Sequence, residues 1–102
     1  MAVAYTTHNR MLTVALSGDI DHHRVKGLVQ DLEREIDEVL PRQLIVDCAG
    51  ITFMDSSGIG LIIGRYKLMA RRGGSVAVIC PDGKIDRIFQ MAGLYQIIER
   101  LA

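Results

Sequence analysis

The side chains with the clearest chemical potential stand together at Asp55, Ser56 and Ser57, followed by Gly58. An apolar run at residues 44–46 precedes them and a long helical pattern follows, so a loop is expected to turn into a helix here. The first N–H groups of a helix lack intrahelical partners, and the helix dipole is positive at that end. Asp55 or Ser56 suits the N-cap, which leaves a spare serine hydroxyl where added negative charge is tolerated. We interpret this hydroxyl as a phosphate acceptor.

The same residues also fit an ordinary helix start, because Ser, Asp and Gly are common at any helix N-terminus. A functional surface is favoured by a second stripe on the predicted helix, formed by Leu61, Arg65, Leu68 and Arg72. Leucines between arginines on an outer face indicate a protein-binding strip, although partial burial in the core explains the leucines equally well. Both interpretations remain open at this point.

Nucleotide and hydrolase chemistry fit the spacing poorly. From Gly58 to Gly64 the pattern is G-x-G-x-x-x-G, one residue off the dinucleotide fingerprint, and no Walker loop is present. Ser56 or Ser57 with a histidine and an aspartate would supply the parts of a hydrolase triad. However, the G-x-S-x-G elbow is absent, because no glycine stands two residues before either serine.

A metal site is equally disfavoured. His22 and His23 follow Asp21, and adjacent residues at a helix start diverge by about 100°, with no third ligand spaced to join them. We therefore expect no metal and no other cofactor. Asp21 is expected to cap the first helix, with the histidines near the surface.

The totals limit the class of protein. A chain of 102 residues with 49% apolar content has the length of a single domain spanning 1–102 and can form one core. Twelve basic and twelve acidic residues cancel, which argues against nucleic acid or an anionic membrane as the main partner. No membrane span or leader pattern is present. Cys48 and Cys80 form no metal-type pair or disulfide framework, which favours reduced thiols and a cytoplasmic location.

The periodicity predicts an α/β fold. Alternating residues predict an antiparallel hairpin over 3–7 and 12–16, and helical spacing predicts a helix that ends at Pro41. The run at 44–46 is typical of a strand covered on both faces. The later elements are expected as a helix after Ser57, a strand at 76–79, a short helix capped by Asp82, and a last strand at 97–98. The result is an α/β sandwich with four to five strands, parallel in the centre, with the hairpin at one side.

The helix after Ser57 needs two specific assignments. Ile59, Ile62, Ile63, Tyr66, Met69 and Ala70 are predicted to face the core. Gly60 and Gly64 lie four residues apart, and we expect them to let the helix backbone approach the sheet closely.

Three stretches together resemble the STAS domain family, and within it the bacterial anti-sigma factor antagonists. They are residues 18–23 after the second strand, residues 53–60 around the serines, and residues 85–94 in the third helix. Residues 21–23 and 64–67 are similar to the sporulation type in particular. The resemblance covers nearly the whole chain and implies a STAS-like single domain with a mixed sheet.

The resemblance also implies a partner-switching function without enzymatic activity. The unmodified protein would bind an anti-sigma factor that is itself an ATP-dependent serine kinase, and so release the sigma factor. Phosphorylation would carry over to Ser56, and a serine phosphatase would reverse it. The residues expected to bind the partner are Asp21, His22, His23, Asp55, Ser57, Gly58, Leu61 and Arg65. The alternatives are an unphosphorylated STAS scaffold and a module that binds a nucleotide or anion. Members of the family usually continue into a further C-terminal helix, which this sequence does not include.

Overall fold

A computed structural model describes residues 2–102, in which strands and helices alternate as the sequence predicts. The elements, in chain order, are β1 (Ala2–His8), β2 (Met11–Ile20), α1 (His22–Val39), β3 (Gln43–Met54), α2 (Ser56–Arg71), β4 (Ser75–Ile79), α3 (Lys84–Met91), the 3₁₀ turn η1 (Leu94–Gln96) and β5 (Glu99–Arg100).

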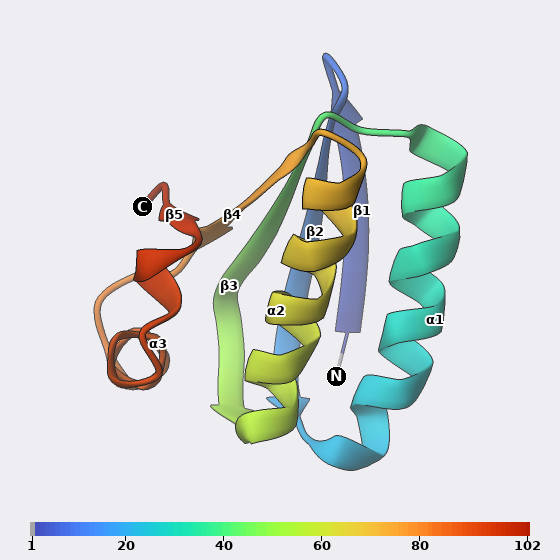
Figure 1. The fold of residues 1–102 in the computed structure, drawn as a ribbon. Coiled ribbons are helices and arrows are strands. Elements are labelled where there is room, and N and C mark those ends of the chain that lie inside the picture. Colours follow the sequence, from blue (N-terminus) through green and yellow to red (C-terminus); the bar gives the residue numbers. More distant parts are fainter. Residues whose placement is uncertain (1) are drawn as a thin grey trace.

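The five strands form one sheet in the order β1-β2-β3-β4-β5 (Figure 1). β1 and β2 are antiparallel, and every later pair is parallel, which confirms the predicted mixed sheet with an N-terminal hairpin. The hairpin turns at Asn9 and Arg10, whose φ angles are 49° and 62°. Two consecutive positive φ angles match the twist of a two-residue hairpin loop.

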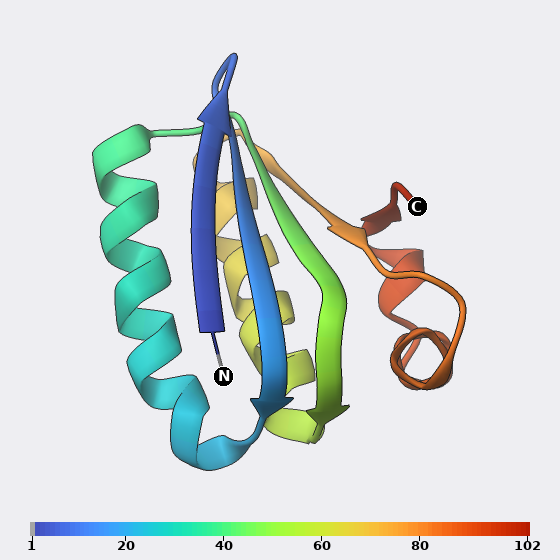
Figure 2. The same cartoon turned by 180° about the vertical axis from the view of Figure 1, so that it is seen from behind.

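The helices α1 and α2 lie over one face of the sheet, and Figure 2 shows the reverse face, over which no described helix lies. The connections from β2 to β3 and from β3 to β4 both advance the sheet in the same direction. Connections between parallel strands are almost always right-handed, so both helices lie on the same face of the sheet. Leu44, Ile45 and Val46 of β3 are all buried, as predicted, although no described helix covers the reverse face (Figure 2). The central strands point alternate side chains toward the helices, namely Leu12, Val14, Leu16, Leu44, Val46 and Cys48.

Residues 47–54, which lie beyond the strand predicted at 44–46, extend β3 to Met54. This part pairs with β2 through two register irregularities, between Ala15 and Ser17 and between Gly18 and Asp19. This part of the strand contains polar residues and a glycine, and it is irregular and half-exposed. It therefore lacks the regular alternation of apolar and polar residues from which a strand can be predicted. The extension carries β3 to the start of α2 without a connecting loop.

The core-facing side of α2 differs from the predicted one. Its buried residues are Gly58, Leu61, Ile62, Arg65 and Met69. Of the predicted stripe, only Ile62 and Met69 are fully buried, while Ala70 is exposed and the others lie half-buried at the flank. The close approach to the sheet occurs at Gly58, since a Cβ there would lie 2.5 Å from Cγ of Met54. Nothing stands within 4 Å of a Cβ built at Gly60 or Gly64, so the role predicted for these two is wrong.

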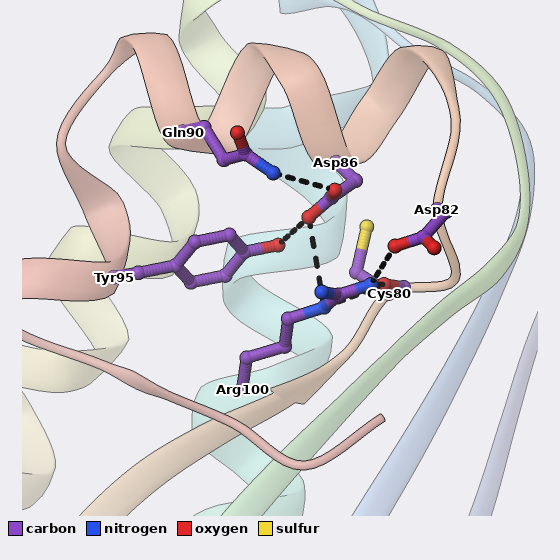
Figure 3. Close-up of polar contacts among 6 residues, drawn as sticks. All are labelled: Cys80, Asp82, Asp86, Gln90, Tyr95 and Arg100. Atoms are coloured by element: carbon purple, nitrogen blue, oxygen red, sulfur yellow. Dashed lines mark hydrogen bonds and ion pairs between the residues drawn. The ribbon is translucent and has the colours of Figure 1, made fainter.

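The buried carboxylate of Asp86 connects α3 with η1 through hydrogen bonds (Figure 3). Asp86 of α3 accepts hydrogen bonds from the hydroxyl of Tyr95 at 2.6 Å and from Nε2 of Gln90 at 2.7 Å. Arg100 donates to the carbonyl of Cys80 and, at 2.7 Å, to Asp82. Asp82 therefore pairs with β5 and does not cap α3, whose N-cap is Gly83. The last strand is Glu99–Arg100, two residues beyond the predicted one.

Candidate functional site

The two longest helices begin side by side at the carboxyl ends of β2 and β3. Ile20 and Met54 end these strands as paired neighbours, and each is followed by an aspartate that caps a helix. Asp21 accepts from the N–H groups of His23 at 3.1 Å and Arg24 at 3.2 Å. The predicted cap at Asp21 is thus confirmed, and of the two candidates for the cap of α2, Asp55 and Ser56, the structure selects Asp55. His22 and His23 are the first two residues of α1.

Asp55 connects the two helix starts. Its Oδ1 accepts from the N–H of Ser57 at 2.9 Å and from the hydroxyl of Ser57, and its Oδ2 accepts from the N–H of His22 at 3.2 Å. The Ser57 hydroxyl, followed by the backbone N–H groups of Ser57, His22 and Gly58, lowers the pKa of the Asp55 carboxyl and outweighs the opposing effect of desolvation. Asp55 therefore keeps its negative charge further into the acid range than an ordinary aspartate.

The two serines have different environments. Ser57 is half-buried, and its hydroxyl is engaged by Asp55. Ser56 is the exposed first residue of α2, and its hydroxyl forms no hydrogen bond with any residue between 2 and 102. A reagent or enzyme approaching this end of the molecule can reach the Ser56 oxygen without disturbing the cap. Ser57 thus has a structural role and the Ser56 hydroxyl is free to react, a distinction that the sequence alone leaves open.

Both histidines are exposed next to this site. Their ring centroids are 4.0 Å apart, and Nδ1 of His22 lies 3.7 Å from Oδ2 of Asp55. Within the described part of the chain, no three His, Cys, Asp or Glu side chains are grouped to hold a metal ion.

Sequence reasoning assigned no role to the polar and apolar residues at the end of β3. The hydroxyl of Thr52 donates to Oδ1 of Asp19 at 2.9 Å, and the neighbouring Phe53 side chain is 44% exposed. The extension of β3 to Met54 was not predicted from the sequence. This extension places Thr52 and Phe53 at the end of the sheet where α2 begins with Ser56.

Three residues expected at the partner surface are buried. Gly58 packs on Met54, Leu61 is 4% exposed, and Arg65 is 9% exposed with Nη2 3.4 Å from Oε1 of Glu33 on α1. The prediction of an outer strip through Leu61 and Arg65 is therefore wrong, because this side of α2 faces the core and α1.

The contrast between the serines leads to a prediction. In the variant Ser57→Ala, the pKa of Asp55 should rise toward its ordinary value, because the main hydrogen bond to the charged form is lost. A carboxyl whose pKa is lowered by folding adds stability above its unfolded pKa of about 3.9, and this stability is lost as the pH falls through the folded pKa. Carbon-13 NMR titration of Asp55 measures the change, and Ser56→Ala is the matched control that should leave it unaltered. An equal shift in both variants would contradict the assignment.

Within residues 2–102, no helix combines the length and the apolar character needed to cross a bilayer. Cys48 and Cys80 are free and buried, and burial raises the pKa of both thiols.

Comparison with known proteins identifies the family. Residues 2–102 match the STAS domain. The anti-sigma F factor antagonist of Paenibacillus polymyxa is 35% identical over 91 residues, which cover 89% of this chain and 78% of that protein. The anti-sigma F factor antagonist of Lysinibacillus sphaericus is 30% identical over 83 residues, covering 81% of this chain and 71% of that protein.

Solved structures agree with this assignment. The anti-sigma factor antagonist SpoIIAA in its unphosphorylated form has a TM-score of 0.83 and 25% identity, with 99% of this chain and 89% of that chain covered. The Bacillus SpoIIAA in its phosphorylated form has a TM-score of 0.75 and 25% identity, with 99% and 92% covered. With its mixed sheet, its N-terminal hairpin and its paired capped helix starts, the chain belongs to the STAS domain family.

Proposed function

We propose that this protein is an anti-sigma factor antagonist, switched off by phosphorylation of Ser56. In the unmodified state it binds an anti-sigma factor that is a serine kinase, and the sigma factor is released. The relatives named above support the antagonist role. The observation that carries the switch is the exposed, unengaged hydroxyl of Ser56 at the first position of α2, beside the engaged hydroxyl of Ser57.

The fold can accept a phosphate at this position. A phosphoserine adds roughly −1.5 to −2 charges at neutral pH, and the N-terminus of a helix favours anions through its dipole and its free N–H groups. Because the Ser56 side chain is exposed, no core contact is lost when it is modified. Phosphorylation should therefore leave the domain folded and change only the surface that a partner meets.

The partner surface is proposed to include the exposed rings of His22 and His23 together with Ser56. Asp21 and Asp55 position this surface as caps, and their carboxylates make its charge partly negative. Adding a dianion at Ser56, directly after Asp55, raises the free-energy cost of docking an acidic or apolar partner. A serine phosphatase that removes the phosphate would restore the binding form.

The direct test is to incubate the protein with the anti-sigma kinase of the same bacterium and ATP, and then to locate the phosphate by mass spectrometry. We expect labelling at Ser56 only and loss of labelling in Ser56→Ala. The variant Ser57→Ala is the matched control, and it should still be labelled at Ser56. Labelling at Ser57 alone would overturn the choice of acceptor. No labelling of a protein that still binds the kinase would favour the unphosphorylated scaffold.

A further inference from the structure

A hollow lies at the end of the molecule opposite Ser56. Three connections come together there: the β1–β2 turn, the α1–β3 connection and the α2–β4 connection (Figure 1). They surround a cavity of about 470 Å³, which is within the usual size of a small-molecule site. The antagonist function proposed above does not use this hollow.

Three arginines, one from each connection, line the hollow: Arg10, Arg42 and Arg72. Asp37 neutralises one of them, since its Oδ1 lies 2.7 Å from Nη2 of Arg72. The carboxyl ends of α1 and α2 add about half a negative charge each. An excess of about one positive charge remains, in a protein whose formal net charge is zero.

Two of the guanidinium groups are available to a ligand. Arg10 makes only a long hydrogen bond of 3.4 Å to the carbonyl of Leu40. The side chain of Arg42 is exposed and forms no hydrogen bond or ion pair with the rest of the described chain. The backbone nevertheless fixes their spacing, because the N–H of Arg42 donates to the carbonyl of Arg10 at 2.8 Å.

The backbone around the hollow is strained at two lining residues. Arg10 has a φ of 62° in a turn position that glycine or asparagine usually takes, and Leu40 has a φ of 51° where helices usually end on glycine. Leu40 is also 59% exposed and sits beside Pro41. Left-handed conformations of such residues are energetically unfavourable and cluster at functional sites.

We propose that this hollow binds a small organic phosphate. A guanidinium group can donate two parallel hydrogen bonds to the oxygens of a phosphate group. Arg10 and Arg42 line the same hollow from two separate segments, so both could bind one phosphate group. The apolar wall formed by Ile36, Leu40 and Pro41 faces the same space and would contact the organic part of the ligand. The site is distinct from the α2 N-terminus, at which Ser56 lies.

Nuclear magnetic resonance titration with pyrophosphate and with adenosine monophosphate tests the proposal at low ionic strength. We expect saturable shifts in the Arg10 and Arg42 side chains and in the amides of Gly73 and Gly74, with half-saturation below about 1 mM. Adenosine monophosphate should bind more tightly than inorganic phosphate, which is titrated as the reference, because the apolar wall contacts its organic part. Equal affinity of the two would contradict a site for an organic phosphate. A poly-glutamate peptide should compete poorly. Preferential binding of that peptide, or no saturation by about 10 mM of any phosphate, would overturn the proposal.

Variants separate binding from folding. Arg42→Gln should weaken pyrophosphate binding at least tenfold, whereas Arg71→Gln, next to the hollow in sequence but not lining it, should change binding less than twofold. Arg10→Gly should also lose binding and yet raise the melting temperature, because glycine adopts the turn conformation without strain. Equal effects of Arg42→Gln and Arg71→Gln would show that only the general charge matters, and the assigned site would be wrong.

Discussion

The variant Ser56→Asp is expected to bind the anti-sigma partner a hundredfold more weakly than the unmodified protein, a difference of about 3 kcal/mol. The new carboxylate would stand at the exposed first position of α2, next to Asp55, whose lowered pKa keeps it ionised. A partner surface that docks here would have to bury two neighbouring negative charges, and like-charge juxtaposition at an interface costs several kcal/mol.

To separate the effect of charge from that of side-chain size, the Ser56→Asp variant needs an uncharged control of similar shape. Ser56→Asn has nearly the shape of Ser56→Asp but no charge, and asparagine is also accepted at helix starts. It should bind within a few fold of the wild type, as should Ser56→Ala. Titration calorimetry or surface plasmon resonance with the purified anti-sigma factor measures all three variants.

Salt provides an independent check. Exposed charges are screened within about 8 Å at physiological ionic strength, so the gap between Ser56→Asp and Ser56→Asn should narrow as salt is raised. If Ser56→Asn bound as weakly as Ser56→Asp, crowding and not charge would be responsible. If all three variants bound equally well, Ser56 would lie outside the interface.

The elements of this fold could be predicted because local signals coincide with them. Alternation marked the hairpin, and 3.6-residue spacing closed by Pro41 marked α1. The cap at Asp21 was predictable because it is a short acceptor directly before a helical pattern, whereas the sequence left the cap of α2 open between Asp55 and Ser56. The structure adds that the two caps lie close together, because β2 and β3 pair in parallel and the carboxyl ends of neighbouring parallel strands lie together.

The rotation of α2 about its axis could not be predicted. Apolar residues occupy most sides of this helix, so several stripes fit its spacing and their distribution around the axis favours no single face strongly. Tertiary contacts decide the matter: Gly58 lies on Met54, and Arg65 reaches Glu33 between the helices. The burial of Leu61 follows from this rotation, and it removes the outer strip that the sequence suggested.

Asp82 shows a second limit of local reasoning. A short acceptor two residues before a helix is a plausible cap, but the carboxylate instead pairs with Arg100, eighteen residues later in the chain. A long-range ion pair leaves no periodic signal, so a sequence pattern cannot reveal it.

Glycine substitutions along α2 test the observed rotation with a large expected contrast. In Gly58→Ala the new Cβ would lie 2.5 Å from Cγ and 2.9 Å from Sδ of Met54, so the helix or the Met54 side chain has to move. Overpacking of this kind costs about 1–3 kcal/mol, which exceeds the gain of up to about 1 kcal/mol from replacing glycine in a helix. Because Cγ is close to the backbone of Met54, a simple change at the tip of the side chain does not relieve the contact. We expect a clear loss of stability.

Gly60→Ala is the matched control on the same helix, because nothing lies within 4 Å of its new Cβ. It should stabilise the protein by about 0.5–1 kcal/mol through helix propensity alone. Thermal unfolding should then place the two variants on opposite sides of the wild type, and roughly 4–8 °C of melting temperature corresponds to each kcal/mol in a domain of this size.

A double variant isolates the contact itself. In a Met54→Ala background the obstruction to Gly58→Ala is gone, so the second substitution should no longer be destabilising, and the two changes should be non-additive. If Gly58→Ala stabilised the wild-type protein as much as Gly60→Ala does, Gly58 would not face Met54. The helix would then be rotated toward the stripe that the sequence predicts, and Leu61 and Arg65 would return to the surface beside Ser56.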